Sequence, residues 1–183
     1  MISIGLDLSL AKTGVVILED GNVIFSGLVK SPPQGSSPLQ ETIRIIKIAD
    51  QIDKIIKDNL GTKDPSVVMI ENLAFMARNT TALTQLAGLN HLVRTRFVTL
   101  GWPFVMVAPS SLKKFITSKG NSDKNLMMMV VFRDYGFESI DDNECDAYSL
   151  AICGNAVLGC PTKTLNKQQK EVVSLLKTQY GKT

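Results

Sequence analysis

Histidine and cysteine are scarce in this chain of 183 residues, which has one histidine and three cysteines. Cys145, Cys153 and Cys160 form an odd set without the paired spacing of a zinc site or a disulfide framework. We therefore expect reduced thiols in a cytoplasmic protein. No uninterrupted apolar run reaches the roughly 18 residues that a membrane helix needs, and the first residues lack the basic start of a signal peptide. These shortages argue against a zinc protein, a disulfide-stapled secreted protein and a membrane protein.

A large charge of one sign is also missing, because the net charge is +3 and the pI is near 8.7. The charge is nevertheless unevenly distributed. Lysines concentrate between residues 113 and 124, and again after residue 160, where Glu171 is the one acid. Such a concentration favours a polyanion partner, and a solvated surface or a soluble tail explains it equally well.

The hydrophobic pattern predicts an α/β fold. Residues 2–9 alternate and then turn apolar, as a strand entering a sheet does, and Asp20-Gly21-Asn22 between two apolar runs predicts an antiparallel hairpin. Further short strands are expected over 66–71 and 103–109, and helices over 41–60, 80–100, 123–136, 143–159 and 166–181. The proline-rich segment 30–40 is expected to be a loop. Three antiparallel strands followed by strands connected through helices make one mixed α/β domain.

Three acidic residues stand at the ends of elements that we expect in the core. Asp7 lies in the first strand, Glu71 ends the strand over 66–71, and Asp146 lies near the start of a helix. Buried carboxylates at close range repel one another unless a hard cation such as Mg²⁺ or Mn²⁺ joins them. Taken singly, an Asx turn, a surface position and a helix-dipole contact explain the three residues at least as well. Their conjunction favours a metal site, in which two ions about 4 Å apart hydrolyse phosphodiesters.

Three segments then carry a resemblance to a known family. GLDLSLAKTGVVI, MIENLAFMARN and NECDAYSLAI, in this order, are similar to the acidic motifs of RuvC-type Holliday-junction resolvases, members of the RNase H-like superfamily. The resemblance covers residues 1–159 and implies an RNase H-like domain, with a mixed five-stranded sheet flanked by helices. It leaves residues 160–183 as a basic C-terminal tail or helix. It also implies that Asp7, Glu71 and Asp146 are catalytic and hold two magnesium ions, for which manganese substitutes.

One acid of the family pattern is missing from this chain. The family has it three residues before the position of Asp146, where this chain has Asn143. Asn143 shares a helix face with Asp146 and can offer its amide oxygen, so we expect it as the fourth metal ligand and catalytic residue. Asp142 shares roughly the same face, and Glu144 is the reserve if it lies in a preceding turn. One acid fewer should weaken metal binding, particularly at the second site.

The loop after Glu71 is expected to meet DNA. It resembles a family loop, one residue shorter, in which an aromatic residue wedges against a base and a basic residue reaches a phosphate. Phe75 fits the first role and Arg78 the second. Taken alone, a core contact for Phe75 and a solvated charge for Arg78 are the simpler explanations.

Lysines provide the remaining expected DNA contacts. Lys113 and Lys124 match the two phosphate-contacting lysines of the family, with the interval between them retained. Lys114 and Lys119 are added by proximity alone. Such contacts position DNA without selecting bases, and they weaken with salt.

The helix over 80–100 corresponds to the one through which family members dimerise. Its stripe of Leu86, Leu89 and Val93 agrees with a helix-pair interface and equally with ordinary core packing. A two-fold dimer would place one active site on each of two symmetric strands of a junction. His91 in this helix is expected to be structural.

We therefore expect a divalent-metal-dependent endonuclease that resolves Holliday junctions and other branched DNA by paired hydrolysis, as a homodimer in the cytoplasm of a bacterium or a phage-infected host. The alternative is a branched-DNA-binding protein with weak or no cleavage, because Asn143 breaks the acid set. A sugar-kinase or actin-like ATPase fits less well, since the chain lacks glycine-rich nucleotide loops. The small size, the basic tail and the altered acids suggest a bacteriophage-type member of the family.

Overall fold

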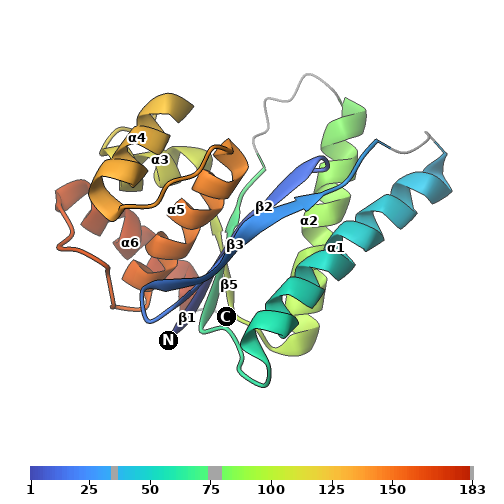
Figure 1. Cartoon of the computed structure of the whole chain (residues 1–183), viewed down its shortest axis with the longest axis horizontal. Helices are drawn as coiled ribbons and strands as arrows, with labels where there is room; N and C mark the ends of the chain where they lie inside the picture. Colours follow the sequence, from blue (N-terminus) through green and yellow to red (C-terminus); the bar gives the residue numbers. More distant parts are fainter. Residues whose placement is uncertain (34–36, 74–79, 182–183) are drawn as a thin grey trace.

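The computed structural model describes residues 1–33, 37–73 and 80–181, with Thr80 described by its backbone alone. A five-stranded sheet in the order β3-β2-β1-β4-β5 forms its centre (Figure 1). The strands are β1 (Ile2–Asp7), β2 (Lys12–Glu19), β3 (Asn22–Lys30), β4 (Val67–Glu71) and β5 (Phe104–Val107). β1, β2 and β3 pair antiparallel, whereas β4 pairs parallel with both β1 and β5. The mixed sheet expected from the sequence is therefore confirmed.

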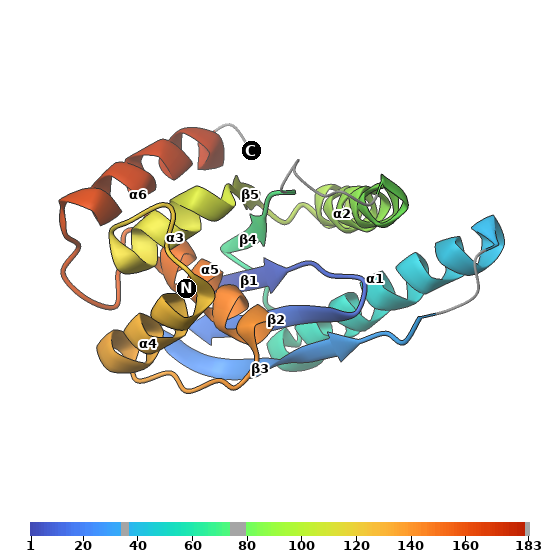
Figure 2. The ribbon, with the colours of Figure 1, turned by 90° about the horizontal axis from the view of Figure 1, so that it is seen from above.

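Helices cover both faces of this sheet. They are α1 (Pro38–Leu60), α2 (Thr80–Leu100), α3 (Pro109–Thr117), α4 (Lys124–Tyr135), α5 (Asp142–Val157) and α6 (Lys167–Tyr180). Figures 1 and 2 show α1 and α2 on one side of the sheet and α3 to α6 on the other. None of the helices in the described ranges combines the length and the apolar character that crossing a membrane requires.

Two helix predictions need correction. The loop predicted over residues 30–40 ends earlier, because α1 begins at Pro38. Ser37 caps the helix: its Oγ accepts a hydrogen bond from the Gln40 backbone N–H, while the Gln40 side chain accepts one from the Ser37 backbone, and Pro38 suits the first helical position. A second helix that the sequence pattern did not predict is α3, a segment of nine residues that contains two lysines. Leu112 and Phe115 nevertheless recur at helical spacing and are buried.

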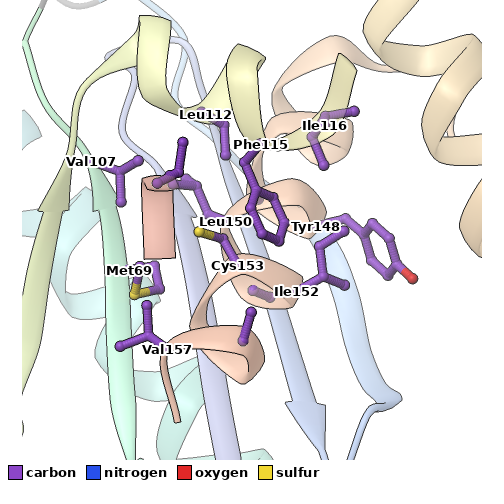
Figure 3. Close-up of a cluster of buried hydrophobic side chains, with 14 of the residues drawn as sticks. Met69, Val107, Leu112, Phe115, Ile116, Tyr148, Leu150, Ile152, Cys153 and Val157 are labelled. Carbon is purple, nitrogen blue, oxygen red and sulfur yellow. The ribbon is translucent and has the colours of Figure 1, made fainter. Parts of the chain in front are cut away.

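The sheet separates two hydrophobic cores because the side chains of β1 alternate between its faces. Ile4 and Leu6 face α1 and α2, where they join Ile52 and Phe97. The opposite core surrounds α5, which is buried along nearly its whole length. Figure 3 shows part of it, in which side chains from β4, β5 and α3 meet those of α5.

Two glycines allow α5 to lie directly on the sheet. A Cβ atom on Gly5 of β1 would lie 1.9 Å from the Ala147 carbonyl oxygen of α5, and one on Gly14 of β2 would lie 2.1 Å from the carbonyl oxygen of Asn143. Real Cβ atoms do not approach backbone so closely, so any side chain at either position would push the helix away. The glycines thus fix the height of α5 above the edge of the sheet where β1 ends.

The last helix packs on the same core as α5. Val172, Val173 and Leu176 of α6 are buried there, and the Gln169 Nε2 donates a hydrogen bond of 2.9 Å to the Phe115 carbonyl oxygen of α3. The separation of residues 160–183 from the preceding domain stays a prediction. The apolar face of α6 nevertheless ties that segment closely to the rest of the fold.

Candidate active site

Neighbouring strand ends bring two of the three predicted acids together. β1 and β4 are parallel, with Leu6 opposite Ile70, so Asp7 and Glu71 follow at the same edge of the sheet. Asp7 projects to the same face as Gly5, two residues earlier, and that face is the one covered by α5. Burial of Asp7 is deep, because 8% of its surface is exposed.

The third acid comes from the start of α5. Gly14 pairs with Asp7 across β1 and β2, and the Asn143 carbonyl lies against Gly14. The first turn of α5 therefore packs on the register pair of Asp7 and Gly14, and Asp146 follows one helical turn later. Asp141 caps the helix, since its side chain accepts a hydrogen bond of 3.1 Å from the Asn143 backbone N–H.

The electrostatics show that the three carboxyl groups form one cluster. Burial, together with the charges of Glu71 and Asp146, raises the pKa of Asp7 well above its ordinary value. Burial and the nearby Asp146 raise the pKa of Glu71 to about 7, although a hydrogen bond donated by the Asp7 carboxyl opposes the rise. Burial raises the pKa of Asp146 to about 6 against the opposing charge of Lys124. Holding three carboxylates here costs free energy that a cation would recover.

Two predicted lysines lie beside these acids. The positive charge of Lys124, at the start of α4, lowers the pKa of Asp7, Glu71 and Asp146. Lys113 of α3 does the same for Glu71 and Asp146. The structure thus brings Lys113 and Lys124 to the acid cluster, where a phosphate bound near the acids would find positive charge.

The other predicted DNA contacts are placed differently. Lys114 forms an ion pair of 2.8 Å with Glu171 of α6. Lys119 is exposed in the connection between α3 and α4. Phe75 and Arg78 lie outside the described residues.

The residues around the missing fourth acid have distinct partners. Glu144 accepts hydrogen bonds from Ser26 Oγ at 2.6 Å and from Ser139 Oγ at 2.5 Å, so both of its oxygens are engaged. The Asn143 Nδ2 donates to an oxygen of Asp141 at 3.2 Å.

Asp142 forms an ion pair with Lys124 and raises the pKa of Asp146. Asp142 therefore belongs to the cluster, on the helix face that its spacing from Asp146 predicts. The signal was present in its spacing, four residues before Asp146.

The donor set suits a hard divalent cation. Carboxylate and amide oxygens are the ligands that Mg²⁺ and Mn²⁺ prefer, and the raised pKa values report repulsion that such an ion removes. Within the described ranges, no three His, Cys, Asp or Glu side chains surround a common point as metal ligands do. Binding an ion would therefore draw the carboxyl groups of the cluster closer together.

An apolar cavity of about 400 Å³ opens beside Glu71. Leu8 and Leu10 line it from the end of β1 and the connection to β2, and Leu83 and Leu86 line it from α2. The acid cluster thus borders a hydrophobic hollow on the side of α2.

Comparison with solved structures identifies the fold. A Thermus thermophilus RuvC structure aligns with a TM-score of 0.66 over 87% of this chain and 98% of that chain, at 17% identity. The structure of T. thermophilus RuvC in complex with Holliday junction substrate aligns with a TM-score of 0.70, over 87% and 97% of the two chains, at 17% identity. The yeast mitochondrial Holliday junction resolvase Ydc2 aligns with a TM-score of 0.55, over 98% and 81%, at 10% identity. The fold is therefore RNase H-like, as the sequence predicts.

Sequence comparison identifies the family. Residues 3–154 match the sequence model described as crossover junction endodeoxyribonuclease RuvC. A crossover junction endodeoxyribonuclease RuvC of Synechococcus sp. (strain WH7803) is 25% identical over 158 residues, 82% of this chain and 96% of that protein. One of Brachyspira hyodysenteriae is 27% identical over 156 residues, 83% and 92% of the two chains. The chain belongs to the RuvC family of crossover junction endodeoxyribonucleases, which are enzymes that depend on a divalent metal.

Proposed function

We propose that this junction-resolving endonuclease cuts Holliday junctions by paired phosphodiester hydrolysis, with Asp7, Glu71 and Asp146 holding two Mg²⁺ ions. Mn²⁺ is expected to substitute. The observation that carries the proposal is the convergence of these three acids from β1, β4 and α5 at one edge of the sheet. Family membership gives the reaction, and the acid cluster gives its place on this chain.

Each side chain then has a defined task. When bound, the divalent ions supply positive charge that stabilises the attacking and leaving oxygens of the phosphodiester. The acids must lose their protons to hold those ions, and the burial that raises their pKa values makes this loss depend on pH. Lys113 and Lys124 are proposed to bind non-bridging oxygens of the DNA backbone beside the acids and to orient the cut strand.

The fourth ligand is proposed to come from the first turn of α5. Asn143 remains the expected metal ligand. Asp142 beside it could supply a charged ligand, and its carboxylate lies close enough to raise the pKa of Asp146. Glu144 is less well supported because Ser26 and Ser139 engage both of its oxygens. Titration with Mn²⁺ separates the three, since the variant that removes the ligand weakens binding: Asn143→Ala, Asp142→Asn or Glu144→Gln.

The cleavage assay uses a four-way junction labelled on one strand at a time, with Mg²⁺ present. Symmetric nicks in opposite strands that a ligase can seal support the proposal, provided that Asp7→Asn and Asp146→Asn abolish them. Glu138→Gln is the control, because it removes an exposed carboxylate from the connection between α4 and α5. A junction that is bound and never nicked would instead support the binding-only alternative, which the family membership does not favour.

A homodimer through α2 is proposed with a corrected interface. The stripe predicted for the partner includes Leu89 and Val93, yet these residues are 0% and 1% exposed and pack on the sheet of their own chain. The exposed face of α2 carries His91 and Thr95, which lie one helical turn apart. A second copy of the chain is proposed to pack on that face.

Light scattering tests this interface. His91→Lys is expected to convert a dimer to a monomer, because it places two like charges in a two-fold contact. Gln51→Lys, on the exposed side of α1, is the control that should leave the dimer intact. A chain that is monomeric before substitution would contradict the dimer and leave the assignment of the acids unaffected. The cytoplasmic location and the bacteriophage origin stay predictions.

A further inference from the structure

Two lysines pair directly across the outer strands of the sheet. Lys12 begins β2, Lys30 ends β3, and they are register partners. Like charges directly opposite on neighbouring strands destabilise the pairing, so this arrangement is unfavourable unless an anion lies nearby. Both side chains are exposed.

The alternation of the strands places both lysines on the face of the acid cluster. Gly14, two residues after Lys12, lies under Asn143 of α5, and the Ser26 hydroxyl of β3 donates a hydrogen bond to Glu144 of α5. Since side chains two or four residues apart share a face, Lys12 and Lys30 project toward the side of α5. They therefore share a face with Asp7, which pairs with Gly14.

The distance from the acids is short. Lys12 comes two residues before Gly14, which places it about 7 Å from Gly14 along β2. Gly14 is the register partner of Asp7 on the neighbouring strand, about 5 Å away. The chain thus has positive charge on both flanks of the acid cluster, with Lys113 and Lys124 from α3 and α4 on one flank and this pair on the other.

The two lysines differ in whether a carboxylate of the chain already pairs with them. Asp141, which caps α5, forms an ion pair of 2.9 Å with Lys12. Among the described residues no carboxylate forms an ion pair with Lys30, so its charge is available to an anion. A phosphate arriving at this edge would contact Lys30 first and would compete with Asp141 for Lys12.

We propose that Lys30, supported by Lys12, is a second phosphate-binding site that holds branched DNA on the β2–β3 flank of the acid cluster. This inference rests on the proposed function, because it takes the acid cluster to be the place where DNA is cut. The ligand is the sugar–phosphate backbone, so the contact adds affinity and register and no base preference.

The test measures binding of a four-way junction in the Asp7→Asn background, so that the strands stay intact, at salt concentrations from 50 to 200 mM. Lys30→Gln is expected to weaken binding about 3- to 10-fold and to lower the slope of log affinity against log salt by about 0.9, the loss of one phosphate contact. Lys30→Arg should retain both. The control is Lys57→Gln, another exposed lysine, in the last turn of α1 on the face of the sheet opposite α5.

The outcomes separate the inference from the proposed function. A loss confined to Lys30→Gln, with unchanged thermal melting, supports the site, and a further loss in the Lys12→Gln, Lys30→Gln double variant supports the role of Lys12. Equal affinities for Lys30→Gln and Lys57→Gln, whether both unchanged or both reduced, overturn it. If the unsubstituted chain fails to nick junctions in Mg²⁺, the proposed function fails instead, and that result is independent of Lys30.

Discussion

Replacing Glu71 by glutamine should make the metal-free protein more stable while it destroys the enzyme. The pKa of Glu71 rises from the ordinary 4.5 to about 7 in the folded chain. A raised pKa means that the folded state gains stability from the protonated form. That contribution is complete below pH 4.5 and is lost as the pH rises through about 7. The glutamine variant has no charge to lose and should escape this destabilisation.

The size of the effect follows from the same pKa. At about 1.4 kcal/mol per pKa unit, the rise corresponds to about 3 kcal/mol, which is an upper limit because Glu71 is only partly buried. We expect Glu71→Gln to raise the free energy of unfolding by about 1–3 kcal/mol at pH 8 in EDTA. For a chain of this length that is about 2–12 °C in Tm. At pH 4 the two proteins should differ by much less.

The assay is urea unfolding at pH 4, 6 and 8 in EDTA and again with Mg²⁺. Mg²⁺ should stabilise the unsubstituted protein and narrow its difference from the variant, because the ion relieves the repulsion that glutamine removes. Glu144→Gln is the control. It replaces one of the two oxygens that accept the Ser26 and Ser139 hydrogen bonds by an NH2 group and should not stabilise the protein. The reasoning is refuted if Glu71→Gln is no more stable than the unsubstituted chain at pH 8, or if the gain is the same at pH 4.

Three further predictions test the packing and the pH dependence of the site. Gly5→Ala should cost more than 2 kcal/mol of stability and reduce nicking, because its Cβ would meet the α5 backbone, whereas Gly88→Ala on α2 should be neutral or stabilising in thermal melts. Leu176→Ala should cost about 2–5 kcal/mol, since the side chain is buried on the α5 core, and the neighbouring exposed Leu175→Ala should change stability by less than about 0.5 kcal/mol. At limiting Mg²⁺ the nicking rate should rise through about pH 6 to 7, as Asp146 and Glu71 lose their protons. Saturating Mg²⁺ should move this rise to lower pH, because the metal competes with the protons. A nicking rate that does not change with pH would contradict the raised pKa values of these acids.

The sequence was sufficient to predict the mixed sheet, and the role of the three acids as metal ligands stays a prediction. The Asp-Gly turn predicted the hairpin of β2 and β3. Asp7 and Glu71 each end an apolar run, and the ends of β1 and β4 lie side by side because these neighbouring strands are parallel. Asp146 was predicted to lie near the start of a helix, and α5 does begin four residues before it, at Asp142.

What the sequence could not determine depends on long-range packing. Periodicity showed that Leu89 and Val93 share a face and could not show that the sheet, rather than a partner, covers it. The role of Glu144 depends on Ser26, which is 118 residues away along the chain. The amphipathic pattern of α3 spans nine residues and is interrupted by Lys113 and Lys114, so no helix was predicted there.

The most direct test of the account is a crystal structure of the protein soaked in Mn²⁺, with the ions located by anomalous scattering. We expect Mn²⁺ to be bound by oxygen atoms of Asp7, Glu71 and Asp146 at the end of the sheet where β1 and β4 end. Manganese found elsewhere, with these three carboxyl groups pointing away from one another, would contradict it.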